Sequence, residues 1–114
     1  MATSLIQSNG VETISPSITT TTGTLISVTA SRRNGIVTMQ IVAQNSSDIG
    51  NGGNVFTGKL SNYLPATNAF GAGYYVGVSL GLFINTSGNI TIRNTGSTIS
   101  KYNNVAPCVT YVEK

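Results

Sequence analysis

The sequence predicts an all-β domain, either an antiparallel β-sandwich or a jelly-roll-like barrel. Three observations support this prediction. Apolar side chains recur at every second position almost throughout the 114 residues, which is the spacing of strands with one buried face. No segment has the spacing of a long helix. About eight short strand-like runs alternate with turn-forming residues, as is typical of sandwiches and Greek-key barrels.

The clearest hairpin covers residues 24–44. Apolar side chains alternate with Ser and Thr along both of its halves. Asn34 and Gly35 lie between the halves, and both residue types accept the positive φ angles of a two-residue type I′ turn. The predicted core face consists of Ile26, Val28, Ala30, Val37, Met39, Ile41 and Ala43.

A second hairpin is expected over residues 76–94. The sequence Thr-Ser-Gly at 86–88 reverses the chain, so that Ile90 and Ile92 return to the core face of the first strand. Glycines recur on the opposite face, which indicates a bulge or the close approach of another group. The first strand contributes five alternating core residues, namely Val76, Val78, Leu80, Leu82 and Ile84.

Shorter strands are expected at residues 11–15, 55–60, 97–102 and 107–112. Residues 45–54 and 61–73 are predicted to be irregular, because Gly, Asn and Ser dominate the first segment and Pro, Gly and Asn interrupt the second.

Residues 1–23 differ from the rest of the chain and are rich in Thr. We expect them to form an N-terminal arm or attachment segment, followed by a head domain over residues 24–114. Pro16 would interrupt a central strand. The segment is therefore an edge strand, an arm on a neighbouring subunit, a link to a larger assembly, or a partly ordered lead-in.

Charge is the most unusual feature of the composition. Charged residues make up 8% of the chain, against about 25% in ordinary soluble domains. Such a surface does not repel copies of itself, so we expect an oligomer. Six scattered cations do not form the basic stripe that binds nucleic acid. The chain also lacks an apolar run of about 18 residues and the features of a secretory signal, so membrane insertion is not expected.

Catalytic and metal sites are not expected either. The chain has no histidine, and its three acidic residues lie in three different segments, so we predict that it is not an enzyme. Asp48 with Asn51 and Asn54 offers too few carboxylates for calcium, and no cofactor is expected. Cys108 is the only cysteine, in an apolar run, and is predicted to be buried.

Tyrosines and asparagines offer a binding surface for sugars, because a phenol ring stacks on C–H faces while amides pair with hydroxyls. Tyr111 is expected in the core. Tyr63 and Tyr102 lie in polar, turn-rich segments and are the preferred ligand contacts, although both side chains could instead seal an edge of the sandwich. The predicted ligand-binding residues are Tyr63, Tyr102, Asp48, Asn51 and Arg93.

Residues 36–114 resemble the receptor-binding head modules of tail fibres and baseplates in phages that infect Gram-positive bacteria. These modules show a Leu-Pro turn segment, matched here by Leu64 and Pro65. A strand of the form L-x-I-x-x-x-G-x-I-x-I then follows, before a closing strand with an aromatic residue. The strand pattern is matched by Leu82, Ile84, Gly88, Ile90 and Ile92.

The resemblance implies a homotrimeric head without catalytic activity that binds host cell-wall polysaccharide from the virion, acting outside the cell. The outer face of the 76–94 hairpin, with Phe83 and the glycines, would then face a neighbouring subunit. Other virion proteins would be bound through the N-terminal segment. The alternative is a structural virion protein, such as a head fibre, decoration or baseplate component, whose partner is another virion protein.

Overall fold

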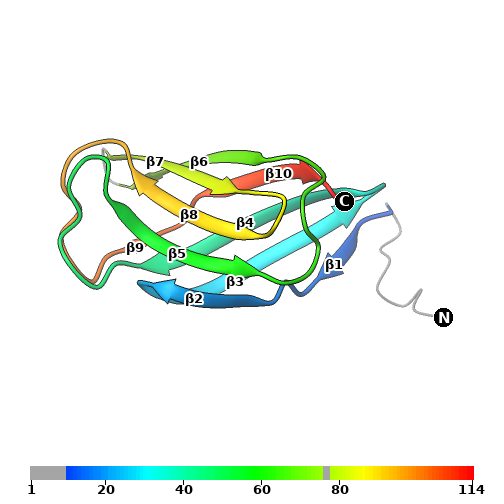
Figure 1. Cartoon of the computed structure of the whole chain (residues 1–114), viewed down its shortest axis with the longest axis horizontal. Coiled ribbons are helices and arrows are strands. Elements are labelled where there is room, and N and C mark those ends of the chain that lie inside the picture. The colour runs from blue at the N-terminus through cyan, green and yellow to red at the C-terminus, as the bar shows by residue number, and fades with distance from the viewer. Residues whose placement is uncertain (1–9, 76–77) are drawn as a thin grey trace.

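A computed structural model describes residues 10–75 and 78–114, which form ten antiparallel strands in one strongly curled sheet, a half-barrel (Figure 1). No helix occurs in these residues, so the all-β prediction is confirmed. The strands are β1 (Glu12–Ile14), β2 (Ile18–Thr22), β3 (Thr24–Arg33), β4 (Ile36–Gln44), β5 (Asn54–Leu60), β6 (Ala69–Tyr75), β7 (Val78–Ile84), β8 (Asn89–Asn94), β9 (Asn104–Val105) and β10 (Cys108–Val112).

The strand order across the sheet is β1-β3-β4-β10-β6-β7-β8-β5-β2, and β9 pairs with β4 beside this path. The two edge strands, β1 and β2, are consecutive in the chain. Ser17 between them accepts a hydrogen bond from the backbone N–H of Ser61, and its own N–H donates to Asn62 Oδ1 at 2.8 Å. Strand twist and the bulges in the β2–β5, β3–β4 and β5–β8 pairs produce the strong curl.

The β3–β4 hairpin has the predicted turn. Arg33 and Ile36 are paired, which leaves Asn34 and Gly35 as a two-residue connection. Their φ angles are 52° and 76°, in the left-handed region that the turn requires.

The four predicted core residues on β4, from Val37 to Ala43, are fully buried. On β3, Ala30 is buried, but the core prediction for Ile26 was wrong, because Ile26 is 47% exposed where the β3–β4 register shifts between Leu25 and Ser27.

The β7–β8 hairpin also follows the prediction. The inward residues of β7 and β8 are buried, and Gly88 turns the chain with φ 94°. Val76, the first expected core residue of this hairpin, lies outside the described residues. The buried residues of the two strands are Val78, Leu80, Leu82, Ile84, Ile90 and Ile92.

The prediction for residues 61–73 was wrong at its C-terminal end, because this part belongs to β6. Alternation is hidden there, since the inward positions hold Gly71 and Gly73 instead of apolar residues. A Cβ on Gly71 would collide with the carbonyl oxygen of Cys108, and one on Gly73 would lie 2.6 Å from Pro107 Cα. β10 and the residues before it therefore pass too close to β6 for larger side chains.

The strand predicted at 97–102 is absent, and only Ile99 pairs there, in an isolated bridge with Ile49. The carbonyls of Ser97, Ile99 and Ser100 accept hydrogen bonds from asparagine side chains, so the segment forms a braced loop. At the other terminus, residues 12–14 and 18–22 are the two edge strands of the sheet, one of the arrangements considered for the Pro16 region.

The core lies inside the curl and takes inward residues from both halves of the sheet. Tyr111 is buried as predicted, with 6% of its surface exposed. The prediction that Cys108 is buried was wrong, because Cys108 is exposed. Alternation along β10 turns Val109 and Tyr111 inward, so Cys108, Thr110 and Val112 must point outward.

Two glycines with positive φ can be tested by substitution, in the variants Gly35→Ala and Gly88→Ala. A Cβ at position 35 meets nothing within 4 Å, so Gly35→Ala should lower the free energy of unfolding by only about 1–2 kcal/mol, because alanine disfavours the left-handed backbone conformation. A Cβ at position 88 collides with the carbonyl oxygen of Leu60, so that variant should lose at least about 2 kcal/mol more. Urea unfolding measures both free energies, and equal losses would contradict the close packing of this turn.

Candidate functional site

The structure divides the five predicted ligand-binding residues between the two ends of the half-barrel. Asp48, Asn51 and Tyr102 lie in the β4–β5 and β8–β9 connections, and Arg93 lies near the end of β8, on the same side of the molecule (Figure 1, left). Tyr63 lies at the opposite end, in the connection from β5 to β6. The five residues therefore do not form one site.

Asn45 holds the loop end together. It continues the inward row of β4 beyond Ala43 and is 1% exposed. Its Nδ2 lies 2.9 Å from the carbonyl oxygen of Ser47, 3.2 Å from that of Ile99 and 2.8 Å from that of Ser100, and its Oδ1 accepts the N–H of Asn103. A single buried side chain thus joins the loops before β5 and before β9, because a buried amide requires partners for all its polar atoms.

Asn94 has the same role at the end of β8, where it continues the inward row beyond Ile92. It is fully buried, its Nδ2 donates to the carbonyls of Ile49 and Ser97, and its Oδ1 accepts the N–H of Gly96. Ile49 and Ile99 exchange two backbone hydrogen bonds of 2.8 Å across the same loops. The loops at this end are therefore held rigidly, although they lack regular secondary structure.

These loops present Tyr102 to solvent. Its side chain is 64% exposed and its φ is 67°, a conformation that is strained for an aromatic residue. Its N–H donates to the Asn45 carbonyl, and Lys101 Nζ lies 5.7 Å from the centre of its ring. Asp48 Oδ1 accepts the N–H of Lys101 at 2.9 Å, so Asp48 and Tyr102 belong to one rigid loop cluster.

Tyr63 has structural partners instead. The Arg32 guanidinium lies 5.2 Å from the centre of the Tyr63 ring, and the Tyr63 carbonyl accepts the Tyr111 hydroxyl at 2.6 Å. Arg32 also forms ion pairs with Glu12 at 2.7 Å and with Glu113 at 2.9 Å. These hydrogen bonds, first to Glu113 and then to Glu12, raise the pKa of Arg32 further above its high ordinary value. The cluster joins β1, β3 and the C-terminus at this end of the half-barrel.

All three acidic residues of the chain thus have structural partners. In the described part of the chain, no three acidic or cysteine side chains gather as metal ligands would. Every buried side-chain nitrogen and oxygen described also has a hydrogen-bond partner. Neither end of the half-barrel therefore presents a carboxylate that is held apart for acid–base chemistry.

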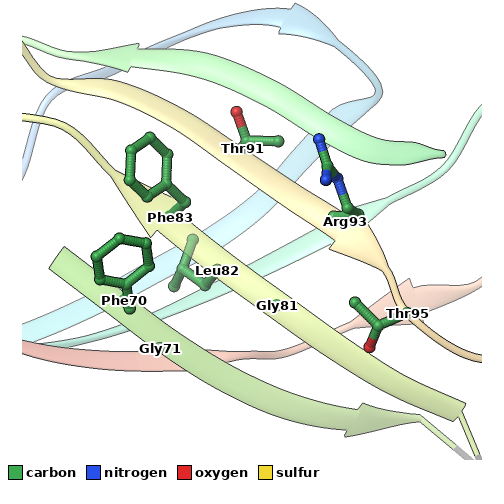
Figure 2. Close-up of a pocket in the computed structure, with 8 residues that line it drawn as sticks. All are labelled: Phe70, Gly71, Gly81, Leu82, Phe83, Thr91, Arg93 and Thr95. Atoms are coloured by element: carbon green, nitrogen blue, oxygen red, sulfur yellow. The ribbon is translucent and has the colours of Figure 1, made fainter. Parts of the chain in front are cut away.

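The best-formed concave surface lies on the outer face of the sheet, across β6, β7 and β8, and Figure 2 shows the residues that line it. We call it the aromatic groove. Its volume is about 460 Å³. Its lining residues are Phe70, Gly71, Gly81, Leu82, Phe83, Thr91, Arg93 and Thr95.

Two phenylalanines form one wall of the groove. Phe70 and Phe83 are directly paired across β6 and β7, with ring centres 5.0 Å apart and planes inclined by 43°. Phe70 is 73% exposed, more than the other exposed large apolar side chains described. Such exposure of a large ring costs free energy in water and is typical of binding surfaces.

Gly81 forms the floor between this wall and Arg93, its cross-strand neighbour on β8. A Cβ at this position would meet only Thr95 Cγ2, at 4.0 Å, so packing within the chain does not require a glycine. A mid-strand glycine destabilises a strand by roughly 0.5–1 kcal/mol relative to alanine. The absence of a side chain at this position leaves the groove deeper.

Among the described residues that line the groove, Arg93 alone is charged, and its side chain is exposed. Thr91 and Thr95 add hydroxyls on the same side. Asn51 adjoins this edge, because its Nδ2 donates to the Gly96 carbonyl at 3.2 Å. The groove therefore combines aromatic faces with hydrogen-bond donors and one positive charge.

Sequence reasoning identified Arg93 but missed Phe70, which lay in a segment predicted to be irregular. Phe83 was noted only as part of the face opposite the core. The pairing of the two rings depends on the register between β6 and β7, and only the recurring glycines on the outer face gave a signal of it.

Compared with known proteins, the chain matches no family model and no curated protein sequence. The described residues also include no helix that is long and apolar enough to cross a membrane.

Asn45→Asp should destabilise the fold strongly, because a buried carboxylate would face three carbonyl oxygens. We expect a loss of at least about 3 kcal/mol at pH 7, smaller at low pH where the acid is protonated and can donate again. Asn104→Asp, at an exposed position, is the matched control and should change stability by less than about 0.5 kcal/mol. Equal effects in urea unfolding would contradict the bracing role of Asn45.

Tyr111 should make the fold sensitive to alkali. Burial, with a smaller contribution from the charge of Glu113, raises the pKa of Tyr111 to about 12. In the unfolded chain this phenol ionises near pH 10. The contribution of the neutral, buried Tyr111 to the free energy of unfolding is therefore fully present below pH 10 and is lost as the pH rises toward 12. Wild type should therefore lose on the order of 2 kcal/mol more than Tyr111→Phe over this interval. Parallel pH profiles of the unfolding free energy would contradict this.

Proposed function

We propose that this chain is a non-catalytic adhesion module that binds saccharide in the aromatic groove. In this proposal the half-barrel is a jelly-roll-like head domain that acts as a homotrimer on the tail fibre or baseplate of a phage and recognises host cell-wall polysaccharide. The exposed Phe70–Phe83 pair beside Arg93, above the Gly81 floor, is the observation that carries the proposal.

The groove has the chemistry that sugars need. The C–H face of a pyranose ring is apolar and stacks on aromatic rings, while its hydroxyls require donors and acceptors. Phe70 and Phe83 supply the rings, Arg93 supplies guanidinium donors, and Thr91 and Thr95 supply hydroxyls. At about 460 Å³ the groove also lies within the size range of small-molecule sites.

The distribution of acidic residues supports binding without turnover. Hydrolysis of a glycosidic bond usually requires two carboxyl groups held roughly 5–10 Å apart across the scissile bond. No acid lines the groove, and Glu12, Asp48 and Glu113 are engaged elsewhere in the structure.

An open groove of this kind binds weakly by itself. Three linked copies facing one polysaccharide surface would raise the effective affinity by a factor of about 10²–10⁴ without any new contact. Multiplication of a weak site is therefore the physical reason for proposing a trimer.

The predicted residues at the loop end fit this proposal as an extension of the groove. Asn51 adjoins the groove edge through Gly96, and Tyr102 is held outward by the braced loops. Tyr63 serves the ion-pair cluster at the other end and packs against the core, so it does not line the groove. The proposed ligand contacts are thus Phe70, Phe83 and Arg93, with Asn51, Asp48 and Tyr102 beside them.

A structural virion protein remains the second candidate, and one observation favours it. Both edge strands, β1 and β2, come from the N-terminal segment, and edge strands can pair with a strand of another protein. In that case the partner would be another virion protein and would pair with edge strand β1 or β2.

Phe70→Ala and Phe83→Ala should each weaken binding to purified cell-wall polysaccharide from Gram-positive bacteria by about 5–10-fold per site, from the loss of stacking. Binding is measured by interferometry on immobilised polysaccharide. Ile26→Ala removes another exposed apolar side chain, outside the groove, and should change nothing. Wild-type protein that binds no polysaccharide fraction, or a Phe70→Ala/Phe83→Ala variant that binds as well as wild type, would refute the proposed function.

A further inference from the structure

A second outer surface lies beside the groove, on β3, β4 and β10. We call it the β4–β10 face. Its cross-strand rows follow the registers Thr29–Gln40–Cys108 and Ser31–Thr38–Thr110, with Ile36 and Val112 paired at the turn end. The first two rows contain no charged residue, and Arg33 is the cross-strand partner of Ile36 in the third row, at the turn end of the face. The outward residues of the face are Thr29, Ser31, Arg33, Ile36, Thr38, Gln40, Cys108, Thr110 and Val112.

Apolar side chains on this face are more exposed than a free surface favours. Ile36 is 46% exposed and Val112 is 61% exposed, and the two residues are direct cross-strand partners. Two shallow hollows, of about 450 and 300 Å³, run along the same face and share Ser31 and Thr38. Adjacent apolar exposure and concave relief are features of protein–protein contacts.

The polar groups of the face can pair with copies of themselves. Hydroxyl and amide groups both donate and accept hydrogen bonds, and Thr38 and Thr110 already do so with each other at 3.4 Å. Charged groups cannot do this, because symmetry would place like charges together. On the β4–β10 face the charged residue, Arg33, lies at the turn end, whereas Arg93 lies inside the aromatic groove on the neighbouring outer surface.

The size of the face fits a contact between subunits. β4 has nine residues, about 31 Å at roughly 3.4 Å per residue, and the three strands β3, β4 and β10 span about 14 Å. The resulting footprint of roughly 430 Å² compares with about 800 Å² per partner in a standard interface. Association through this face alone should therefore be reversible and concentration-dependent.

We infer that the β4–β10 face packs against a further copy of this chain and, in the trimer of the proposed function, faces the symmetry axis. This inference rests on that proposal for the number of copies. It moves the subunit contact away from the outer face of β7–β8, where the resemblance placed it, because that surface carries the aromatic groove. The aromatic groove then remains open to ligand.

Cys108 reports directly on this contact, because it is the only cysteine of the chain and lies exposed on the face. Its rate of reaction with a thiol reagent such as DTNB is measured over a range of protein concentrations, with size by light scattering on the same samples. Assembly should slow the reaction by roughly tenfold as the face becomes covered. A chain that stays monomeric up to millimolar concentration, or assembles without protection of Cys108, overturns the inference.

Thr110→Glu places a like charge in the middle row of the face and should abolish assembly and Cys108 protection. Thr19→Glu is the matched control on β2, where Lys59 is the cross-strand partner, and should assemble as wild type does. Circular dichroism and urea unfolding establish that both variants are folded. Persistent assembly of folded Thr110→Glu overturns the inference, and the Cys108 measurement on wild type decides the matter if that variant does not fold.

The same variants separate this inference from the proposed function. Folded, monomeric Thr110→Glu should bind immobilised cell-wall polysaccharide about 10²-fold or more weakly than wild type, through loss of avidity, while keeping the affinity of each groove for soluble fragments. Assembly through the face without polysaccharide binding would remove the proposed function and leave the inference standing. Polysaccharide binding by a protein that assembles through another face would remove the inference and leave the proposed function standing.

Discussion

Strict alternation of inward and outward side chains around one curled sheet is the constraint on which this structure depends. Each strand contributes one row to a shared interior, so the core is continuous although the chain has neither helices in its described part nor disulfides. At the two ends of the curled sheet, polar backbone groups of the loops need hydrogen-bond partners that the strands do not supply. Asn45 and Asn94 extend two inward rows and bind loop carbonyls at one end, while Arg32 joins Glu12 and Glu113 at the other.

The same alternation leaves the outer rows free to vary, because they contribute little to the core. On β6–β8 they carry two phenylalanines, a glycine floor and Arg93, which together make a concave surface with donors at its edge. On β3, β4 and β10 they carry hydroxyl, amide, thiol and aliphatic groups, with Arg33 as the charged residue at the turn end. We infer that the first surface contacts saccharide and the second contacts a further copy. A chain with 8% charged residues can support both surfaces, since few like charges oppose close approach.

The loop end shows how much of the site could be predicted. Asp48, Asn51, Arg93 and Tyr102 were chosen from residue type and context, and the structure places them at one end of the molecule. Tyr63 was chosen for the same reasons but lies under Arg32, because a turn-rich sequence context does not reveal which ring a distant guanidinium will cover. Phe70 was missed, since Gly71 and Gly73 concealed the alternation of β6.

Local sequence alone determined the all-β class, the β3–β4 turn at Asn34–Gly35 and the inward rows of β4, β7 and β8. These features depend on backbone preference and on a period of two, and both act between near neighbours. Only tertiary structure decided that β10 lies between β4 and β6 with Cys108 outward, that two asparagines hold the loop end, and that Phe70 meets Phe83 beside Arg93. Those arrangements arise from strand order and register, which bring together residues far apart in the chain and so leave little trace in any single segment.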